Sequence, residues 1–101
     1  MTNLSLAAAA AALALFAQAA SAETLRIATE GAYPPFNYTE PNGQLAGFDV
    51  DIARELCTRL KAECEIVAQD WDGIIPGLLA NKYDLIVASM FITDERKQQV
   101  D

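Results

Sequence analysis

After residue 24, segments with the apolar spacing of a strand alternate with segments that have the apolar spacing of a helix. Residues 25–29 and 64–69 alternate as strands do, and residues 83–89 have a four-residue apolar core typical of a buried parallel strand. Residues 49–60 and 73–81 instead repeat apolar positions at helical spacing. Strands that alternate with helices predict an α/β fold, a three-layer parallel sheet with flanking helices and right-handed crossovers.

Turn and capping residues indicate where the first elements begin. Asn42 and Gly43 lie between two short semi-apolar runs, which predicts a β-hairpin. Asp49 fits the N-cap of the first helix, with Phe48 before it as a hydrophobic staple. The predicted inward face of this helix comprises Ile52, Ala53, Leu56, Cys57 and Leu60.

The remaining boundaries follow from the same rules. Residues 30–36 are predicted as loop, because they contain a glycine and two prolines. The second helix is expected to have Asp72 as its cap and Pro76 in its first turn. Thr93 is expected to cap a last helix that has barely begun at residue 101. The predicted inward residues of the second helix are Ile75, Leu78 and Leu79.

The apolar composition changes this picture at the N-terminus. Of the 101 residues 52% are hydrophobic, but many of them lie in residues 4–20, which are nearly all Ala and Leu. Small residues follow at positions 20–22, so we interpret residues 1–22 as a secretory signal peptide cleaved after Ala22. A membrane anchor is the alternative, although the run is short for a span and rich in weakly hydrophobic Ala. The absence of Lys and Arg before the run argues against both interpretations.

Charge and residue types exclude several classes of function. Residues 23–101 carry all 7 Lys and Arg and all 14 Asp and Glu, a formal charge of −7, so the basic footprint of a nucleic-acid-binding protein is missing. With no His and only 2 Cys, no metal site is expected. Ser89 has no base nearby in sequence, and no glycine-rich phosphate loop is present. Asp49 and Asp51 suit a helix N-terminus better than an acid–base pair. The sequence therefore predicts a protein that is not an enzyme and uses no cofactor.

The two cysteines are Cys57 and Cys64. In an exported chain such a pair favours a disulfide, which here would tie the end of the first helix to the following strand. The short loop that it closes corresponds to a stabilisation of about 2–3 kcal/mol. Two buried free thiols are the alternative.

Candidate ligand-binding residues lie beyond the carboxyl ends of the strands, where open α/β sheets bind their ligands. Three segments reach this edge, residues 30–33, 70–71 and 89–96. Together they contain carboxylates, aromatic rings, a hydroxyl and one arginine. They predict a polar pocket with aromatic walls.

Each candidate in these segments also has a purely structural interpretation. Arg96 can hold a carboxylate through two parallel hydrogen bonds, or pair with the carboxylates that precede it in its own helix. Tyr33 and Trp71 can sandwich a ligand, or pack in the core. Glu30 can pair with a cation, or be solvated.

Four motifs are distributed along residues 25–101. They are Ala32–Phe36, Gly47–Ile52 with Leu56, Cys57 and Leu60, Trp71–Asp72 with Ile75, Pro76 and Leu78, and Ile92–Arg96. Their combination resembles the family 3 extracellular solute-binding proteins, the periplasmic polar-amino-acid-binding proteins of ABC importers. The spacing of the two cysteines is similar to that of the disulfide in the lysine/arginine/ornithine- and histidine-binding branch.

The resemblance implies how the carboxylate end of a ligand would be held. Arg96 would clamp the α-carboxylate of an amino acid. Ser89 and the backbone of Met90 and Phe91 would donate hydrogen bonds to the same group. Many family members have Ser or Thr where Phe91 stands, and this bulkier wall is compatible with an opine-like or modified amino acid.

The other end of the ligand is assigned in the same way. Tyr33 and Trp71 would stack on its side chain. Glu30 stands where the basic-amino-acid branch has a shorter Asp facing the far end of that side chain. A basic or otherwise polar amino acid is therefore the expected ligand.

Members of this family have two lobes joined by a hinge, so residues 23–101 correspond to the N-terminal part of lobe 1, without the hinge and lobe 2. The resemblance further implies a monomeric periplasmic protein that delivers its amino acid to the membrane permease of an ABC importer, and poor binding by this part alone. The alternatives are an enzyme on the same fold, like the cyclohexadienyl dehydratases, and a truncated product without function.

Overall fold

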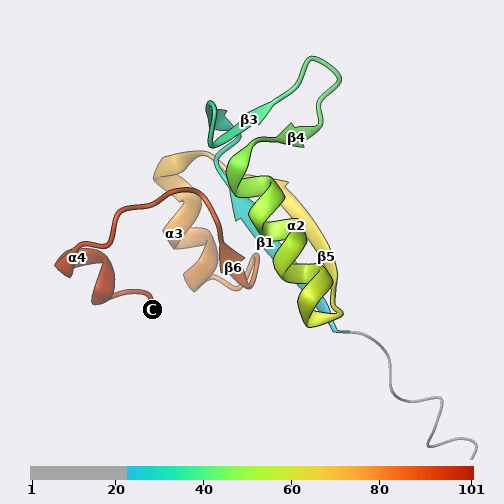
Figure 1. Cartoon of the computed structure of the whole chain (residues 1–101). Helices are drawn as coiled ribbons and strands as arrows, with labels where there is room; N and C mark the ends of the chain where they lie inside the picture. Colours follow the sequence, from blue (N-terminus) through green and yellow to red (C-terminus); the bar gives the residue numbers. More distant parts are fainter. Residues whose placement is uncertain (1–22) are drawn as a thin grey trace, which may run out of the picture.

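A computed structural model describes residues 23–101, and the predicted signal peptide, residues 1–22, lies outside this range. The central sheet has three parallel strands in the order β5-β1-β6 (Figure 1). In the pairing register, Ile27 lies opposite Ile66 on one side and Leu85 on the other. The predicted α/β fold with a parallel sheet is confirmed. The strands are β1 (Thr24–Thr29), β5 (Glu63–Ala68) and β6 (Leu85–Ile86).

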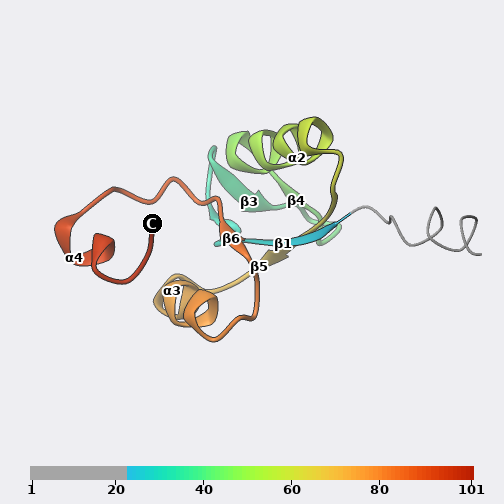
Figure 2. The same cartoon turned by 90° about the horizontal axis from the view of Figure 1, so that it is seen from below.

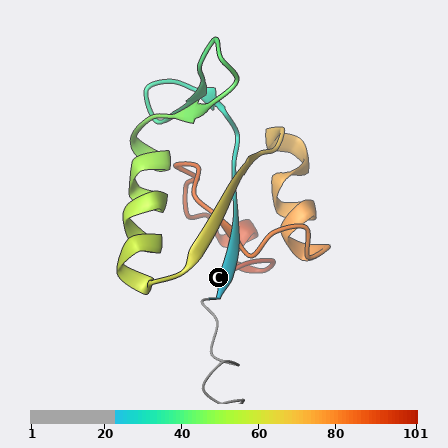
Figure 3. The same cartoon turned by 90° about the vertical axis from the view of Figure 1, so that its right-hand side faces the viewer.

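One helix covers each face of this sheet. α2 (Phe48–Leu60) lies on one face and α3 (Trp71–Leu79) on the other, which gives the three predicted layers (Figures 2 and 3). Because successive residues of a strand point to opposite faces, Ile27 packs with α2 and Ala28 with α3. The two buried clusters are Ile27, Ala53 and Cys57, and Ala28, Ile74, Tyr83 and Ala88.

A small antiparallel sheet lies beyond the carboxyl end of β1, in the order β2-β3-β4 (Figure 1). The predicted hairpin is confirmed, since β3 and β4 pair across the turn that contains Asn42 and Gly43. The loop prediction for residues 30–36 is wrong in part, because Ala32 and Tyr33 pair with β3. The strands are β2 (Ala32–Tyr33), β3 (Asn37–Thr39) and β4 (Leu45–Ala46).

The start of α2 differs from the prediction. The helix begins at Phe48 with Gly47 as its N-cap, and the Asp49 side chain makes no capping hydrogen bond. Asp49 is 4% exposed and Phe48 is 61% exposed. Phe48 is the first residue of the helix and not the residue before its cap, where a staple would lie. The first helical N–H groups find other acceptors: that of Asp49 donates to the Phe36 carbonyl at 2.7 Å. Because the backbone of the preceding loop caps the helix, the Asp49 carboxylate is free to turn inward.

The inward face of α2 is also rotated from the predicted one. Ala53 and Cys57 are buried as predicted, and Val50 joins them. Ile52, Leu56 and Leu60 are exposed, so their predicted burial is wrong. Their four-residue spacing aligns them along the flank of the helix rather than against the sheet.

α3 begins at Trp71, with Asp70 rather than Asp72 as its N-cap. Pro76 therefore lies inside the helix and not in its first turn. Leu79 is exposed, in contrast to the prediction. The residues that pack against β1 are Ile74, which is fully buried, with Ile75 and Leu78 partly buried beside it.

The third strand is shorter than predicted, and it is an edge strand. Pairing extends over Leu85–Ile86 only, followed by one hydrogen bond from Val87 N–H to the Ala28 carbonyl at 3.0 Å. Leu85 is exposed, so the predicted burial of both strand faces is wrong. The chain then forms α4 (Asp94–Lys97), which Thr93 caps as predicted. Within residues 23–101, no helix has the length and apolarity to cross a membrane.

Cys57 and Cys64 form a disulfide, which confirms the predicted pairing. It connects the last turns of α2 to β5, with the two Cα atoms 6.1 Å apart. The closed loop spans a sequence separation of 7 residues. The bridge therefore fixes one helix of the three-layer arrangement to the edge of the sheet.

Reduction of this disulfide is expected to lower the free energy of unfolding by about 2–3 kcal/mol, because the unfolded chain regains the entropy of the opened loop. Urea unfolding with and without dithiothreitol measures the difference. The double variant Cys57→Ala and Cys64→Ala is the control, and its stability should not respond to dithiothreitol. An equal response in both proteins would contradict the prediction.

Asp84 joins β1 at the end of the sheet opposite the small antiparallel sheet. The Arg26 N–H donates to Asp84 Oδ2 at 2.9 Å, and the Arg26 guanidinium lies 3.3 Å from Oδ1. The backbone hydrogen bond, with a smaller contribution from the guanidinium, holds the pKa of Asp84 below its usual value.

The stability contributed by Asp84 is therefore expected to depend on pH. Because the folded state lowers this pKa, the contribution is present above the unfolded value of about 3.9 and is lost as pH falls through the folded value. Urea unfolding should show a stability gap between the wild type and Asp84→Asn at pH 7 that narrows below pH 4. Asp101→Asn, at the exposed end of the chain, is the control. A gap that stays constant with pH would refute the assignment.

Candidate functional site

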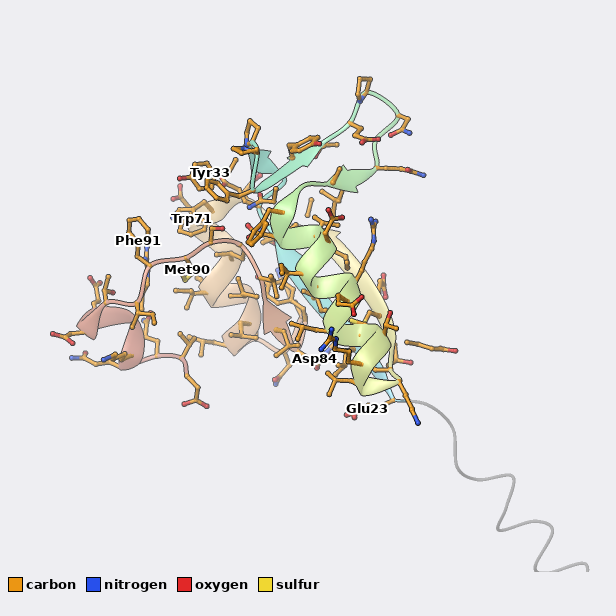
Figure 4. The ribbon with its side chains drawn as sticks, in the orientation of Figure 1. Glu23, Tyr33, Trp71, Asp84, Met90 and Phe91 are labelled. Carbon is orange, nitrogen blue, oxygen red and sulfur yellow. A yellow bond between two sulfur atoms is a disulfide. The ribbon has the colours of Figure 1, made fainter. Side chains whose placement is uncertain are left out.

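A cavity of about 340 Å³ lies beyond the carboxyl ends of β1, β5 and β6. It brings together six of the seven predicted site residues. Figure 4 shows the side chains of Tyr33, Trp71 and Phe91 gathered on this side of the molecule, away from Asp84 and Glu23. The cavity is lined by Glu30, Tyr33, Trp71, Ala88, Ser89, Phe91 and Arg96.

The register of the parallel sheet explains why these residues meet. Thr29, the last residue of β1, lies opposite Ala68, the last residue of β5. One further hydrogen bond, from Gln69 N–H to the Thr29 carbonyl at 2.9 Å, extends this ladder past the strand ends. Glu30 and Trp71 follow the two strands, so the sheet delivers both to the same edge.

The aromatic residues fulfil two roles at once. Trp71 is partly buried against the cluster of Ala28, Ile74, Tyr83 and Ala88, and it also lines the cavity. Tyr33 is half exposed, and its ring lies 5.0 Å from that of Phe36 between centroids. The structural interpretation and the ligand-binding interpretation of Trp71 are therefore compatible.

Three nearby residues contact Arg96 and orient its side chain. The Thr93 side chain accepts a hydrogen bond from the Arg96 N–H at 3.2 Å. Arg96 Nη1 donates to the Phe91 carbonyl at 2.8 Å, and its guanidinium carbon lies 5.6 Å from the centroid of the Trp71 ring. The ion pairs within residues 23–101 join Arg26 to Asp84 and Arg59 to Glu55, so the guanidinium is not paired with a carboxylate of α4. It keeps N–H groups that can bind a ligand carboxylate.

The segment from Ser89 to Phe91 presents mainly backbone donors. The Ser89 hydroxyl donates to Asp49, at 2.8 Å from Oδ1 and 2.9 Å from Oδ2, so its proton is already used. Within residues 23–101, the backbone N–H groups of Ser89, Met90 and Phe91 donate to no protein acceptor. The Met90 side chain packs against the α3 cluster and does not line the cavity.

Sequence reasoning missed three residues of this region. Ala88 lines the cavity but carries no chemical signal. Asn37 is fully buried and joins Asp49 to the loop after β1. A buried amide in a short strand is unusual, yet burial is not visible in the sequence. Asp49 fits the capping rule in the sequence, but its side chain instead contacts Asn37 and Ser89.

The cavity lining carries charges of both signs. Its lining includes one carboxylate, Glu30, and one guanidinium, Arg96. Residues 23–101 contain no group of three metal-ligating side chains. A larger hollow of about 890 Å³ follows the edge of β6. It shares Ala88, Ser89, Phe91 and Arg96 with the first cavity, but it includes neither Glu30 nor the aromatic residues Tyr33 and Trp71.

Comparison with known proteins identifies relatives of this region. Residues 25–101 match the model of the bacterial extracellular solute-binding proteins, family 3. Over 82 residues the chain is 54% identical to the octopine-binding periplasmic protein of Rhizobium meliloti. This match covers 81% of this chain and 28% of that protein. It is also 54% identical to the L-arginine-binding protein of Pseudomonas aeruginosa, over 81% of this chain and 32% of that protein. The chain thus spans about a third of the length of these relatives.

Two solved structures extend the comparison. The ancestral amino acid-binding protein AncCDT-1, described as a precursor of cyclohexadienyl dehydratase, is 46% identical with a TM-score of 0.73, over 77% of this chain and 35% of that protein. A variant of domain 1 of TmArgBP in its arginine-bound form is 45% identical with a TM-score of 0.71, over 74% of this chain and 58% of that chain.

Proposed function

The chain belongs to family 3 of the bacterial extracellular solute-binding proteins, and from this premise we propose that residues 23–101 supply the lobe 1 half of a site for a cationic amino acid or an opine derived from one. The single observation that carries the proposal is the cavity that gathers Glu30, Tyr33, Trp71 and Arg96. The names of the relatives, octopine- and L-arginine-binding, support the same ligand class.

In this proposal the ligand α-carboxylate binds Arg96 and the backbone N–H groups of Ser89, Met90 and Phe91. The guanidinium supplies two parallel charge-assisted hydrogen bonds, which are stronger than neutral ones. The ligand side chain lies between Tyr33 and Trp71. An opine carries a carboxyalkyl group on its α-nitrogen, and the exposed ring of Phe91 offers the alkyl part of that group an apolar surface.

The cationic end of the ligand is assigned to Glu30, which follows β1 directly. A carboxylate that accepts from a guanidinium or ammonium group contributes about 1.5–3 kcal/mol. A neutral ligand of similar length gains only the stacking and the carboxylate contacts. The charge of Glu30 therefore favours arginine and lysine over glutamine.

We also propose the setting in which this site works. Residues 1–22 direct export to the periplasm, and the whole protein delivers its ligand, as a monomer, to the membrane permease of an ABC importer. The likeness to AncCDT-1 supports ligand capture rather than enzyme activity, because that precursor is itself an amino acid-binding protein. The arginine-bound form of domain 1 of TmArgBP supports ligand binding by a single lobe.

Glu30→Gln tests the ligand class. Trp71 is the only tryptophan and lines the cavity, so its fluorescence reports on ligand binding. Titration of the chain should show at least a tenfold loss of affinity for L-arginine, about 1.4 kcal/mol, and less than a threefold change for L-glutamine.

The matched control is Glu65→Gln, an exposed carboxylate on β5, which should change neither affinity. A chimera in which residues 25–101 replace the same segment of the Pseudomonas aeruginosa relative supplies a second lobe for tight binding. Equal losses for L-arginine and L-glutamine would remove the role of Glu30. No response to any amino acid in either protein would refute the proposed function.

A further inference from the structure

Asp49 is the one charged side chain that is buried within residues 23–101. A carboxylate withdrawn from water is strongly disfavoured unless hydrogen bonds replace its hydration. Both of its oxygens have such partners, Asn37 and Ser89. It therefore joins segments that are distant in the sequence.

The first connection reaches the loop that follows β1. Asn37 Nδ2 donates to Asp49 Oδ2 at 2.9 Å. Asn37 Oδ1 accepts from the Gly31 N–H at 2.7 Å. Both ends of the Asn37 amide are thus in use, which fixes its orientation. Gly31 directly follows Glu30, so Asp49 holds the backbone of the Glu30 wall through Asn37.

The second connection reaches the opposite wall. The Ser89 hydroxyl donates to the Asp49 carboxylate at 2.8 Å. Ser89 has a φ of 54°, in the left-handed region, which is unfavourable for a non-glycine residue. The contact with Asp49 offsets part of this cost. It fixes the direction in which the chain turns toward Phe91.

The position of α2 makes these contacts informative. No residue of α2 is among the seven that line the cavity. The N-terminal end of the helix nevertheless lies beside the strands and loops that carry the cavity (Figure 1). Asp49 connects this end of α2 to both walls without lining the cavity itself.

We propose that Asp49 is a positioning residue of the ligand site. It sets the relative placement of the Glu30 wall and the Ser89–Phe91 wall, and through that placement it controls ligand affinity without touching the ligand. This inference rests on the proposed function, because it assumes that an amino acid binds between these walls. Gly31, Asn37, Asp49 and Ser89 form the positioning network.

An exchange of the two central side chains tests the network. Asn37→Asp alone places a second carboxylate within 2.9 Å of the first, so donors are missing and like charges repel. Adding Asp49→Asn restores the pattern with donor and acceptor reversed. The Gly31 N–H again donates to residue 37, the new amide of residue 49 donates to residue 37, and the Ser89 hydroxyl donates to the amide oxygen.

The expected result is loss followed by rescue. Asn37→Asp should weaken L-arginine binding at least thirtyfold in the Trp71 fluorescence titration, and the double exchange should return within threefold of the wild type. The ¹H–¹⁵N signals of Gly31 and Ser89 should move in the single variant and return in the double. Asp84→Asn is the control: it lowers stability at the far end of the sheet (Figure 4) and should leave affinity unchanged.

Three outcomes would overturn the proposal. They are wild-type affinity in a folded Asn37→Asp variant, unchanged Gly31 and Ser89 signals in that variant, and a double exchange that restores the signals but not the affinity. If Asn37→Asp does not fold, Ser89→Ala removes one connection only and should cost at least fivefold in affinity; wild-type affinity there also overturns the proposal. Absence of L-arginine binding by both the wild-type chain and the chimera would refute the proposed function instead, and the two signals would still decide whether Asp49 connects the walls.

Discussion

Replacing Arg96 with alanine is expected to lower the affinity of the chain for L-arginine at least a hundredfold. The proposed clamp consists of two charge-assisted hydrogen bonds to the ligand carboxylate, together worth about 3 kcal/mol or more. A loss of 2.7 kcal/mol corresponds to about a hundredfold change in Kd. The Phe91 carbonyl, which accepts from Arg96 Nη1, would also face the ligand carboxylate without its donor. Trp71 fluorescence and calorimetry can both measure the effect.

Comparison among ligands separates this role from that of Glu30. Because every α-amino acid carries the same carboxylate, Arg96→Ala should weaken L-arginine and L-glutamine equally, whereas Glu30→Gln should not. Arg96→Lys keeps the charge but loses the planar fork, so an intermediate loss of about tenfold is expected. Arg59→Ala, which removes an exposed guanidinium paired with Glu55, is the matched control. Retained affinity in Arg96→Ala would refute the clamp.

The residues that follow strands were the part of the site that the sequence could predict. In a parallel sheet all strands end at one edge, so the sequence alone predicts that Glu30, Trp71 and Arg96 lie together. The structure gathers them in one cavity, with Tyr33 and Ser89. Such a prediction needs only the order of the elements, and this order was confirmed.

The burial of Asp49 could not be predicted in this way. An aspartate at the start of a helix fits the capping rule whether its side chain faces water or the core. Its inward orientation depends on Asn37 and Ser89, which lie 12 and 40 residues away in the sequence. Only the folded chain brings these partners together, so the local spacing of apolar residues cannot predict the contacts.

Edge strands are a second limit of sequence patterns. The apolar run in residues 83–89 is typical of a strand buried on both faces, yet Leu85 is exposed. β6 pairs with β1 on one side, and within residues 23–101 no strand pairs with it on the other. The apolar run in residues 83–89 indicates that burial of this strand is favourable, but it does not indicate which residues would cover it.

Replacing Gly47 with alanine is expected to lower the free energy of unfolding by about 3 kcal/mol or more. Gly47 has φ 114° and ψ 179°, a region that only glycine readily occupies and that costs other residues about 1–3 kcal/mol. A Cβ there would also lie 2.6 Å from the Phe36 carbonyl oxygen and 2.8 Å from that of Pro35. These two carbonyls accept from the first N–H groups of α2, those of Phe48 and Asp49. The added methyl group would therefore separate the helix from its cap.

Gly43→Ala isolates the steric part of this effect. Gly43 also has a positive φ, 86°, but a Cβ at that position would meet no atom within 4 Å. Its replacement should cost only the conformational preference, about 1 kcal/mol. Urea unfolding of both variants measures the difference, and equal losses would show that the close approach at Gly47 contributes nothing. Because Asp49 lies two residues after Gly47, a displaced helix start should also shift the ¹H–¹⁵N signal of Ser89, whereas Gly43→Ala should leave that signal in place.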